Sequence, residues 1–176
     1  SFATTTTYDP AWGAPITVID ANGQRTDLTY DALGRLTAVW LPNRLKSSGL
    51  SANETFAYSV SNTAPSWVQT SKISGDASAY AVTYTIYDSL LRELQTQTTG
   101  VNGGRVITGK TFDSRGLQTV ADADVADASA PSGPPAIFNS GAVPAETTTA
   151  YDGAGRPTVV AFLTILGFSL YDTIVV

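Results

Sequence analysis

The chain has 176 residues, ten of them basic and fifteen acidic, and a net charge of −5 at pH 7. This balance excludes the basic surface that a phosphate backbone requires, so we expect no nucleic-acid partner. Histidine and cysteine are absent, which excludes thiol nucleophiles, histidine bases and most zinc, copper and haem ligation. We therefore expect no cofactor and no metal. Methionine is absent too, and we expect the chain to be a piece of a longer protein.

Charged residues make up only 14% of the chain, and the abundance of threonine, glycine and aromatic residues is typical of β-sheets. Alternating or β-branched segments predict antiparallel strands, and no segment predicts a helix. Asn22-Gly23 is the strongest short hairpin signal. Residues 42–54 and 122–146 are expected to be long irregular inserts. The predicted strands, in chain order, are residues 16–19, 24–30, 35–40, 55–60, 67–73, 79–87, 92–98, 105–112, 117–121, 147–151, 159–166 and 168–176.

The longest hydrophobic run that could suggest a membrane segment covers residues 159–171. A membrane helix needs about 20 apolar residues, and this run is shorter. Gly167 also divides it into two segments rich in β-branched and aromatic residues. The run therefore predicts two strands about a turn, and no membrane span.

A pattern of an aromatic residue, Asp, two further residues, Gly and Arg recurs along the chain. Its copies start at residues 8, 30, 87, 112 and 151, which are 22, 57, 25 and 39 residues apart, so the unit has 22 to 25 residues with insertions in two intervals. An internal period of this kind determines the architecture. The members of the pattern are Tyr8 and Asp9; Tyr30, Asp31, Gly34 and Arg35; Tyr87, Asp88 and Arg92; Phe112, Asp113 and Gly116; and Tyr151, Asp152, Gly155 and Arg156.

The spacing of Asp and Gly has a physical explanation. Asp suits the first position of a type I turn, because its carboxylate accepts a hydrogen bond from the backbone two residues on, and Gly suits the fourth. A left-handed Gly closes a hairpin with a bulge. We therefore expect hairpin tips at residues 31–34, 113–116 and 152–155. Gly13 comes one residue late, and Leu91 replaces the Gly, so we expect a different backbone at the Leu91 tip.

The repeated pattern resembles the YD repeat of the RHS (rearrangement hotspot) proteins, which are related to the shells of teneurins and toxin-complex proteins. The resemblance covers residues 8–172 and implies an all-β, curled array of antiparallel β-hairpins, with residues 1–176 as one segment of a larger shell. It implies a secreted or cell-surface bacterial protein whose partners are the other repeats of the shell and an enclosed C-terminal domain. The family's autoproteolytic core and toxin domain have no match here, so neither activity is carried over.

The aspartates of the pattern are also the strongest candidates for chemistry. A catalytic pair needs two carboxylates in different environments, whereas one carboxylate in every hairpin indicates a structural role. The alternate acids at Asp122, Asp124 and Asp127 could collect calcium, but the run lacks the Gly and terminal Glu of an EF-hand, so we interpret it as a solvated loop. We predict no catalytic residue and no enzyme; lysine bases at Lys46, Lys72 or Lys110 lack any flanking nucleophile pattern.

The tryptophans support an alternative function. Trp12, Trp40 and Trp67 are candidates for stacking on sugar rings, although aromatic residues in a repeated sheet serve first in cross-strand packing. The leading hypothesis is therefore a structural segment of an RHS-type β-shell that encloses or presents a toxin or effector domain. The alternative is an extracellular carbohydrate-binding or surface-binding module, with glycans as partners.

Overall fold

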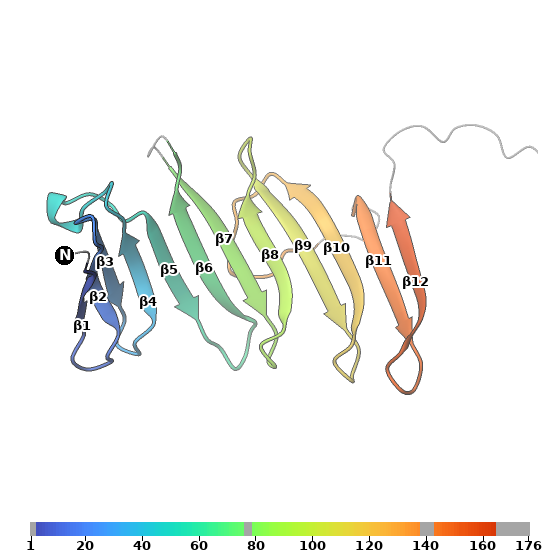
Figure 1. Ribbon diagram of the computed structural model, residues 1–176. Helices are drawn as coiled ribbons and strands as arrows, with labels where there is room; N and C mark the ends of the chain where they lie inside the picture. Colours follow the sequence, from blue (N-terminus) through green and yellow to red (C-terminus); the bar gives the residue numbers. More distant parts are fainter. Residues whose placement is uncertain (1–2, 76–78, 138–142, 165–176) are drawn as a thin grey trace, which may run out of the picture. The chain divides into compact units, whose positions relative to one another are not determined.

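The computed structural model describes residues 3–75, 79–137 and 143–164. These residues form twelve strands, arranged in chain order from β1 to β12 in one antiparallel sheet (Figure 1). The predicted all-β, antiparallel hairpin fold is confirmed. The strands are β1 (Thr5–Tyr8), β2 (Pro15–Ile19), β3 (Arg25–Tyr30), β4 (Leu36–Trp40), β5 (Glu54–Ser59), β6 (Ser66–Ile73), β7 (Tyr80–Tyr87), β8 (Glu93–Thr99), β9 (Arg105–Phe112), β10 (Gln118–Asp127), β11 (Ala145–Tyr151) and β12 (Pro157–Thr164).

Helical structure is almost absent from the described part of the chain. A single 3-10 turn, η1 (Lys46–Ser48), lies in the first of the two predicted inserts and ends at the left-handed Gly49. No helix among the described residues is long and apolar enough to cross a bilayer.

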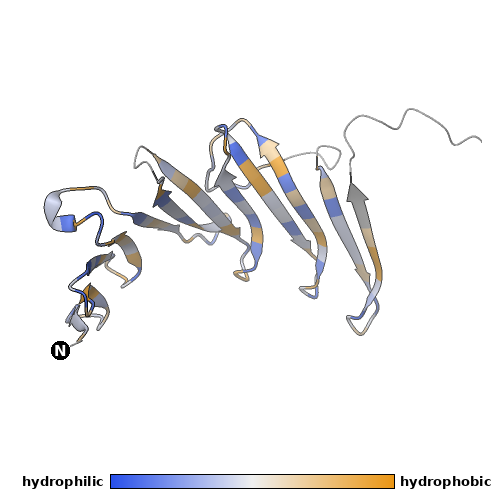
Figure 2. Ribbon diagram, turned by 45° about the horizontal axis from the view of Figure 1, so that its top comes forward, coloured by the Kyte–Doolittle hydropathy of each residue, from blue (hydrophilic) through white to orange (hydrophobic). Residues whose placement is uncertain are grey.

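The strands follow from local sequence patterns. Their β-branched and aromatic residues fit a pleated surface, and hydrophobic and hydrophilic residues are interspersed along them (Figure 2). Strands that follow each other in the chain pair with each other, as in the register Thr17↔Asp27 between β2 and β3 and Gln97↔Ile107 between β8 and β9. The fold is therefore built from consecutive hairpins.

The chain divides into two compact units. Unit 1 consists of Ser1–Ser59 with Val68–Thr83, and unit 2 of Val60–Trp67 with Tyr84–Val176. Buried residues are few in both, and many are polar. Those of unit 1 are Asp27, Ala38, Ala52, Asn53 and Ser71; those of unit 2 include Ile86, Gln95, Gln97, Ile107, Val125 and Val143.

The core of unit 2 depends on the insert between β10 and β11. Ile107 and Val125 lie on β9 and β10, but Val143, which is 1% exposed, and Ala136 come from the insert and pack against them. The insert therefore supplies the apolar cover that a sheet face needs.

The structure differs from the prediction at the start of this insert. Residues 122–127, which we expected to be irregular, belong to β10 and pair with β9 as far as Asp127↔Arg105. A bulge between Asp122 and Val125, where Asp124 has a φ of 53°, allows the pairing to resume. β1 was not predicted. The predicted strand at 159–166 corresponds to β12, and the one at 168–176 lies outside the described residues.

Candidate functional site

The tip between β3 and β4 is organised by the carboxylate of Asp31. Its Oδ1 accepts hydrogen bonds from the backbone N–H groups of Leu33 and Arg35, both at 2.9 Å, and its Oδ2 accepts one from Arg35 Nε at 2.7 Å. The N–H of Gly34 donates to the Asp31 carbonyl at 3.0 Å, and Gly34 has a φ of 75°. One carboxylate therefore fixes the backbone and a guanidinium together.

The same arrangement occurs at three other tips, those of Asp88, Asp113 and Asp152. In each, Oδ1 accepts two backbone N–H groups at 2.9 Å, from the residues two and four positions on. Arg92 and Arg156 donate through Nε to Oδ2 at 2.7 and 2.8 Å. At the Asp113 tip the residue after the Gly is Leu117, and Arg115, inside the turn, donates instead at 3.0 Å.

The expectation of a different backbone at Leu91 is wrong. Leu91 has a φ of 59°, and its N–H donates to the Asp88 carbonyl at 3.0 Å, just as Gly34 does at its own tip. A side chain with a Cβ is strained in this region. The hydrogen bonds of the Asp88 carboxylate therefore hold the turn without the Gly.

Two further tips also begin with an aspartate, Asp20 at one and Asp9 at the other. At residues 20–24, predicted as an Asn-Gly turn, Oδ1 of Asp20 accepts the N–H groups of Asn22 and Gln24, both at 2.8 Å. The Asn22-Gly23 pair predicted this turn, but the role of Asp20 was missed, although it stands three residues before Gly23 as Asp31 stands before Gly34. At the Asp9 tip the turn is one residue longer, because Asp9 N–H donates to the carbonyl of Ala14 at 2.8 Å.

In unit 1, two tyrosines connect the Asp31 tip to the strands beside it. The hydroxyl of Tyr30 donates to the carbonyl of Pro15 at 2.9 Å, where the strand after the Asp9 tip begins. Tyr58 donates likewise to Leu36 at 2.8 Å, and the Arg35 guanidinium lies 4.6 Å from the Tyr58 ring centroid. The sequence reading missed Tyr58, because Ser59 follows it in place of Asp.

Unit 2 has equivalent contacts between tips. The Arg92 guanidinium lies 4.5 Å from the Phe112 ring centroid, so the phenylalanine keeps the stacking role although it has no hydroxyl. Arg115 Nη1 donates to the carbonyl of Asp152 at 2.6 Å, and the Tyr151 hydroxyl donates to Gln118 at 2.8 Å. The Asp9 and Asp31 tips of unit 1 are therefore connected, as are the Asp88, Asp113 and Asp152 tips of unit 2; we call these connected tips a row.

The close approach of neighbouring tips is a second reason why glycine occurs in these turns. A Cβ at Gly34 would lie 3.0 Å from Cδ2 of Trp12, and one at Gly116 would lie 3.1 Å from Nη1 of Arg92. In each case the neighbouring atom belongs to the preceding tip. At Gly23, by contrast, nothing lies within 4 Å of such a Cβ.

The hydrogen bonds at the tips keep the carboxylates ionised. The N–H of Arg35 is the largest of several hydrogen bonds that hold the pKa of Asp31 below its ordinary value. The pKa values of Asp113 and Asp152 are lowered chiefly by the N–H groups of Leu117 and Arg156. For Asp88, burial acts to raise the pKa, but the hydrogen bonds from Arg92 and Leu90 outweigh it. None of these carboxylates has the raised pKa of a general acid.

The acidic run after residue 121 is divided among different partners. Asp127 pairs with Arg105 at 2.8 Å, and Asp124 is exposed. Asp122 lies directly opposite Glu146 of β11, and its buried Oδ1 has no hydrogen-bond partner among the described residues. Burial and then Glu146 raise the pKa of Asp122. No group of three or more His, Cys, Asp or Glu side chains in the described residues is placed to hold a metal ion.

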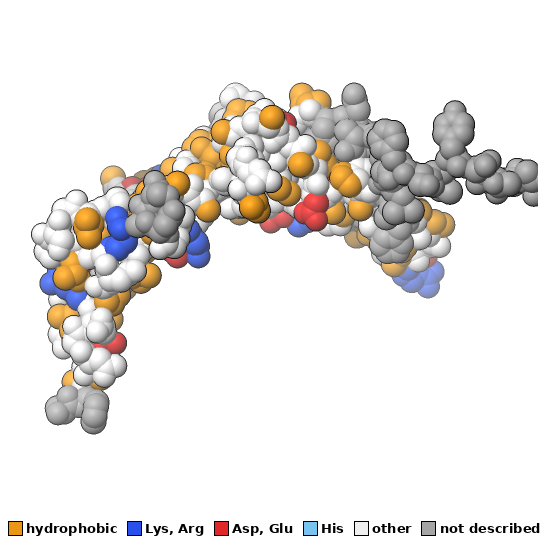
Figure 3. Space-filling view, turned by 90° about the horizontal axis from the view of Figure 1, so that it is seen from above, with side chains coloured by type: hydrophobic (Ala, Val, Ile, Leu, Met, Phe, Trp, Pro, Cys, Tyr) orange, Lys and Arg blue, Asp and Glu red, His pale blue; other side chains and the backbone are white. Residues whose placement is uncertain are grey.

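The three tryptophans have different surroundings. Trp40 donates through Nε1 to the carbonyl of Leu50 at 2.9 Å, and Trp67 makes an edge contact with Tyr84, the ring centroids 5.2 Å apart. Trp12 is 52% exposed and lines a groove of about 830 Å³ in unit 1, together with residues such as Arg25 and Asp27. Charged side chains lie as scattered patches on the face in Figure 3.

A comparison with protein-family models agrees with the repeat. Residues 8–39 match the family model described as RHS Repeat, a range that contains the tips at Asp9, Asp20 and Asp31. The chain is also similar to a chain in the crystal structure of TcdB2-TccC3-Cdc42, with 17% sequence identity and a TM-score of 0.39. That match covers 93% of this chain and 9% of the other, so this chain spans less than a tenth of the other's length. No curated protein matches the chain.

We predict that Leu91→Gly stabilises unit 2. Glycine removes the left-handed strain, and the leucine side chain is 72% exposed, so little packing is lost. The free energy of unfolding in urea should rise by up to about 1 kcal/mol. Leu90→Gly is the matched control, because Leu90 is equally exposed but has no positive φ; it should not stabilise the protein. A loss of stability in Leu91→Gly would contradict the turn assignment.

The contact with Trp12 predicts that two glycine substitutions lower the free energy of unfolding by different amounts. Gly34→Ala and Gly23→Ala each place a Cβ at positive φ, which costs about 1 kcal/mol, but only at Gly34 does the Cβ meet the indole. Urea unfolding should therefore show a larger loss for Gly34→Ala. In a Trp12→Ala background the two losses should become equal, and an unchanged difference would show that the indole is not responsible.

The pair Asp122 and Glu146 predicts a pH-dependent stability. Because the folded-state pKa of Asp122 is raised above its ordinary value of 3.8, its contribution is fully present below that value and is lost as the pH rises through the folded pKa. The tip carboxylates have lowered pKa values, so their contribution to stability is present at neutral pH and is lost as the pH falls. Asp122→Asn should therefore raise the urea midpoint at pH 7, and the gain should shrink towards pH 4.

Asp124→Asn is the control for this measurement, since Asp124 is an exposed acid of the same strand. Its effect should not follow the same pH dependence. An Asp122→Asn gain that is equal at both pH values would contradict the raised pKa.

Proposed function

Because the chain carries an RHS repeat at residues 8–39, we propose that it is a wall segment of an RHS-type β-shell. The shell encloses or presents a toxin or effector domain, and this segment performs no catalysis itself. Its partners are the other repeats of the shell and an enclosed C-terminal domain. The protein acts outside the cell or at the surface of a bacterial cell.

The row of connected tips is the observation that supports this role best. Hairpins whose tips carry the repeated pattern contact a neighbouring tip through an aromatic hydroxyl, a stacked guanidinium or an arginine bound to a carbonyl. Such a row can be extended by further hairpins without any new kind of contact. The carboxylates at the tips are already occupied by hydrogen bonds, which favours a structural role over acid–base chemistry.

Protease protection in the parent protein tests the wall role. We expect a domain that follows the repeats to resist protease while the wall is intact. Asp113→Ala removes the carboxylate that fixes one tip and should expose that domain to cleavage. Lys72→Ala, which removes only a partly exposed ion pair with Glu54, should leave protection unchanged. A following domain that is cleaved equally in native and variant proteins would contradict enclosure.

Carbohydrate binding is the second candidate, and the exposed Trp12 beside its groove favours it. Arg25 and Asp27 in the groove supply polar groups beside an aromatic ring, the combination that sugar rings require. A glycan array separates the two functions. A wall segment should show no saturable glycan binding. A sugar site should bind a defined glycan, and Trp12→Ala should abolish that binding.

A further inference from the structure

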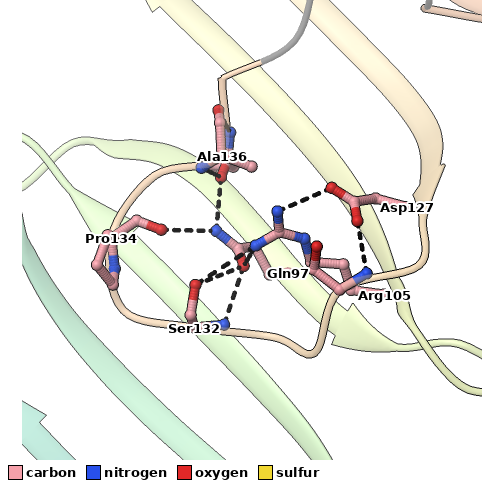
Figure 4. A network of polar contacts seen from close by, with 8 residues as sticks. Gln97, Arg105, Asp127, Ser132, Pro134 and Ala136 are labelled. Carbon is pink, nitrogen blue, oxygen red and sulfur yellow. Dashed lines mark hydrogen bonds and ion pairs between the residues drawn. The ribbon is translucent and has the colours of Figure 1, made fainter.

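A segment of the insert between β10 and β11 curves around Gln97 of β8 (Figure 4) and is also bound by Gln95 of the same strand. We call residues 131–136 the strap. Gln97 donates through Nε2 to the carbonyl of Pro134 at 2.9 Å and accepts the N–H of Ser132 through Oε1 at 3.0 Å. Gln95 donates to the carbonyl of Ala136 at 3.0 Å and accepts the N–H of the same residue at 2.8 Å. The glutamines therefore bind the strap through its backbone.

Both glutamines are held ready for this binding. Gln97 is completely buried and Gln95 is 6% exposed. Gln97 donates to Oε1 of Gln95 at 2.8 Å, and Arg105, itself paired with Asp127, donates to Oε1 of Gln97 at 2.7 Å (Figure 4). A buried amide without partners is costly. The two buried amides therefore need backbone groups of another segment as partners.

Selectivity for the strap sequence comes from shape. A Cβ at Gly133 would overlap the indole of Trp67, so only glycine fits there. Ala136 packs against the cluster of Ile107, Val125 and Val143, which leaves room for a small side chain. Prolines at 131, 134 and 135 have no N–H, and two of the three remaining N–H groups of the strap are taken by the glutamines.

The strap is separable from the strands on either side of it. The pairing of β10 with β11 extends from Val120↔Thr148 to Ala123↔Ala145 and does not involve residues 131–136. Next to the strap, residues 128–130 are exposed, and Ile137 is 98% exposed. Release of the strap therefore breaks none of these β10–β11 pairs; it removes Ala136 from the cluster of Ile107, Val125 and Val143 and uncovers the glutamines.

We propose that Gln95, Gln97, Arg105 and Trp67 form a peptide-binding site that the strap occupies in cis. The partner in trans is a segment of another polypeptide with the same chemistry: a glycine facing Trp67, followed by prolines and a small residue. The bound peptide takes the place of the strap and forms the same hydrogen bonds with the site. This activity is separate from the formation of a wall.

A peptide-binding experiment tests the site. Gly133→Val displaces the strap by overlap with Trp67, and the probe is a fluorescently labelled peptide with the sequence of residues 130–137. Fluorescence anisotropy should show saturable one-to-one binding to Gly133→Val, at least about tenfold tighter than to the native chain, whose site is occupied. Gly153→Val is the matched control, because nothing lies within 4 Å of a Cβ there; it should behave as the native chain does.

Two changes test the proposed contacts. A peptide with valine in place of its glycine should bind at least about tenfold more weakly, and so should the native peptide when Gln97→Leu is added to Gly133→Val, because backbone groups lose their partners. The proposal is overturned if folded Gly133→Val shows no saturable binding up to about 1 mM peptide, or if the two peptides bind equally. Should Gly133→Val fail to fold, a variant with residues 131–136 replaced by a glycine–serine segment of equal length decides by the same criteria.

Discussion

The aspartate carboxylate at four tips, those of Asp31, Asp88, Asp113 and Asp152, is the interaction on which the rest of this structure depends. It accepts two backbone N–H groups through one oxygen and a guanidinium through the other, as in the set Asp31, Leu33 and Arg35. The turn direction, the register of the two strands and the position of the arginine are therefore fixed at one point. That arginine or its neighbours then contact the next tip, so a local turn also sets the order of the hairpins.

Such a fold needs little apolar core. The few fully buried apolar side chains, such as Ile86 and Ile107, could not by themselves order so many hairpins. Polar contacts between tips and the insert that covers unit 2 supply the remaining order. Because the four tips share the same backbone contacts, single positions such as Leu91 or Leu117 can depart from the pattern while the backbone of the tip is kept.

The strands and most tips could be predicted from the sequence, because alternation and the spacing of Asp and Gly are local signals. The departures from these patterns could not be predicted from the sequence. A missing glycine at Leu91 suggested another turn, whereas hydrogen bonds to Asp88 keep the backbone. Gln95 is bound to Ala136, 41 residues away in the chain, and neither residue belongs to a periodic pattern. The bulge that carries β10 to Asp127 likewise depends on pairing with β9, which local propensity does not encode.

Titration of the side-chain carboxyl carbons by NMR tests the central role of the tip carboxylates most directly. The account predicts that Asp31, Asp88, Asp113 and Asp152 all titrate below the ordinary aspartate value of 3.8. At each tip, the backbone amide proton four residues on should shift at the same pH, because it is hydrogen-bonded to that carboxylate. Titration of these groups at or above the ordinary value, with no response from those amides, would contradict the account.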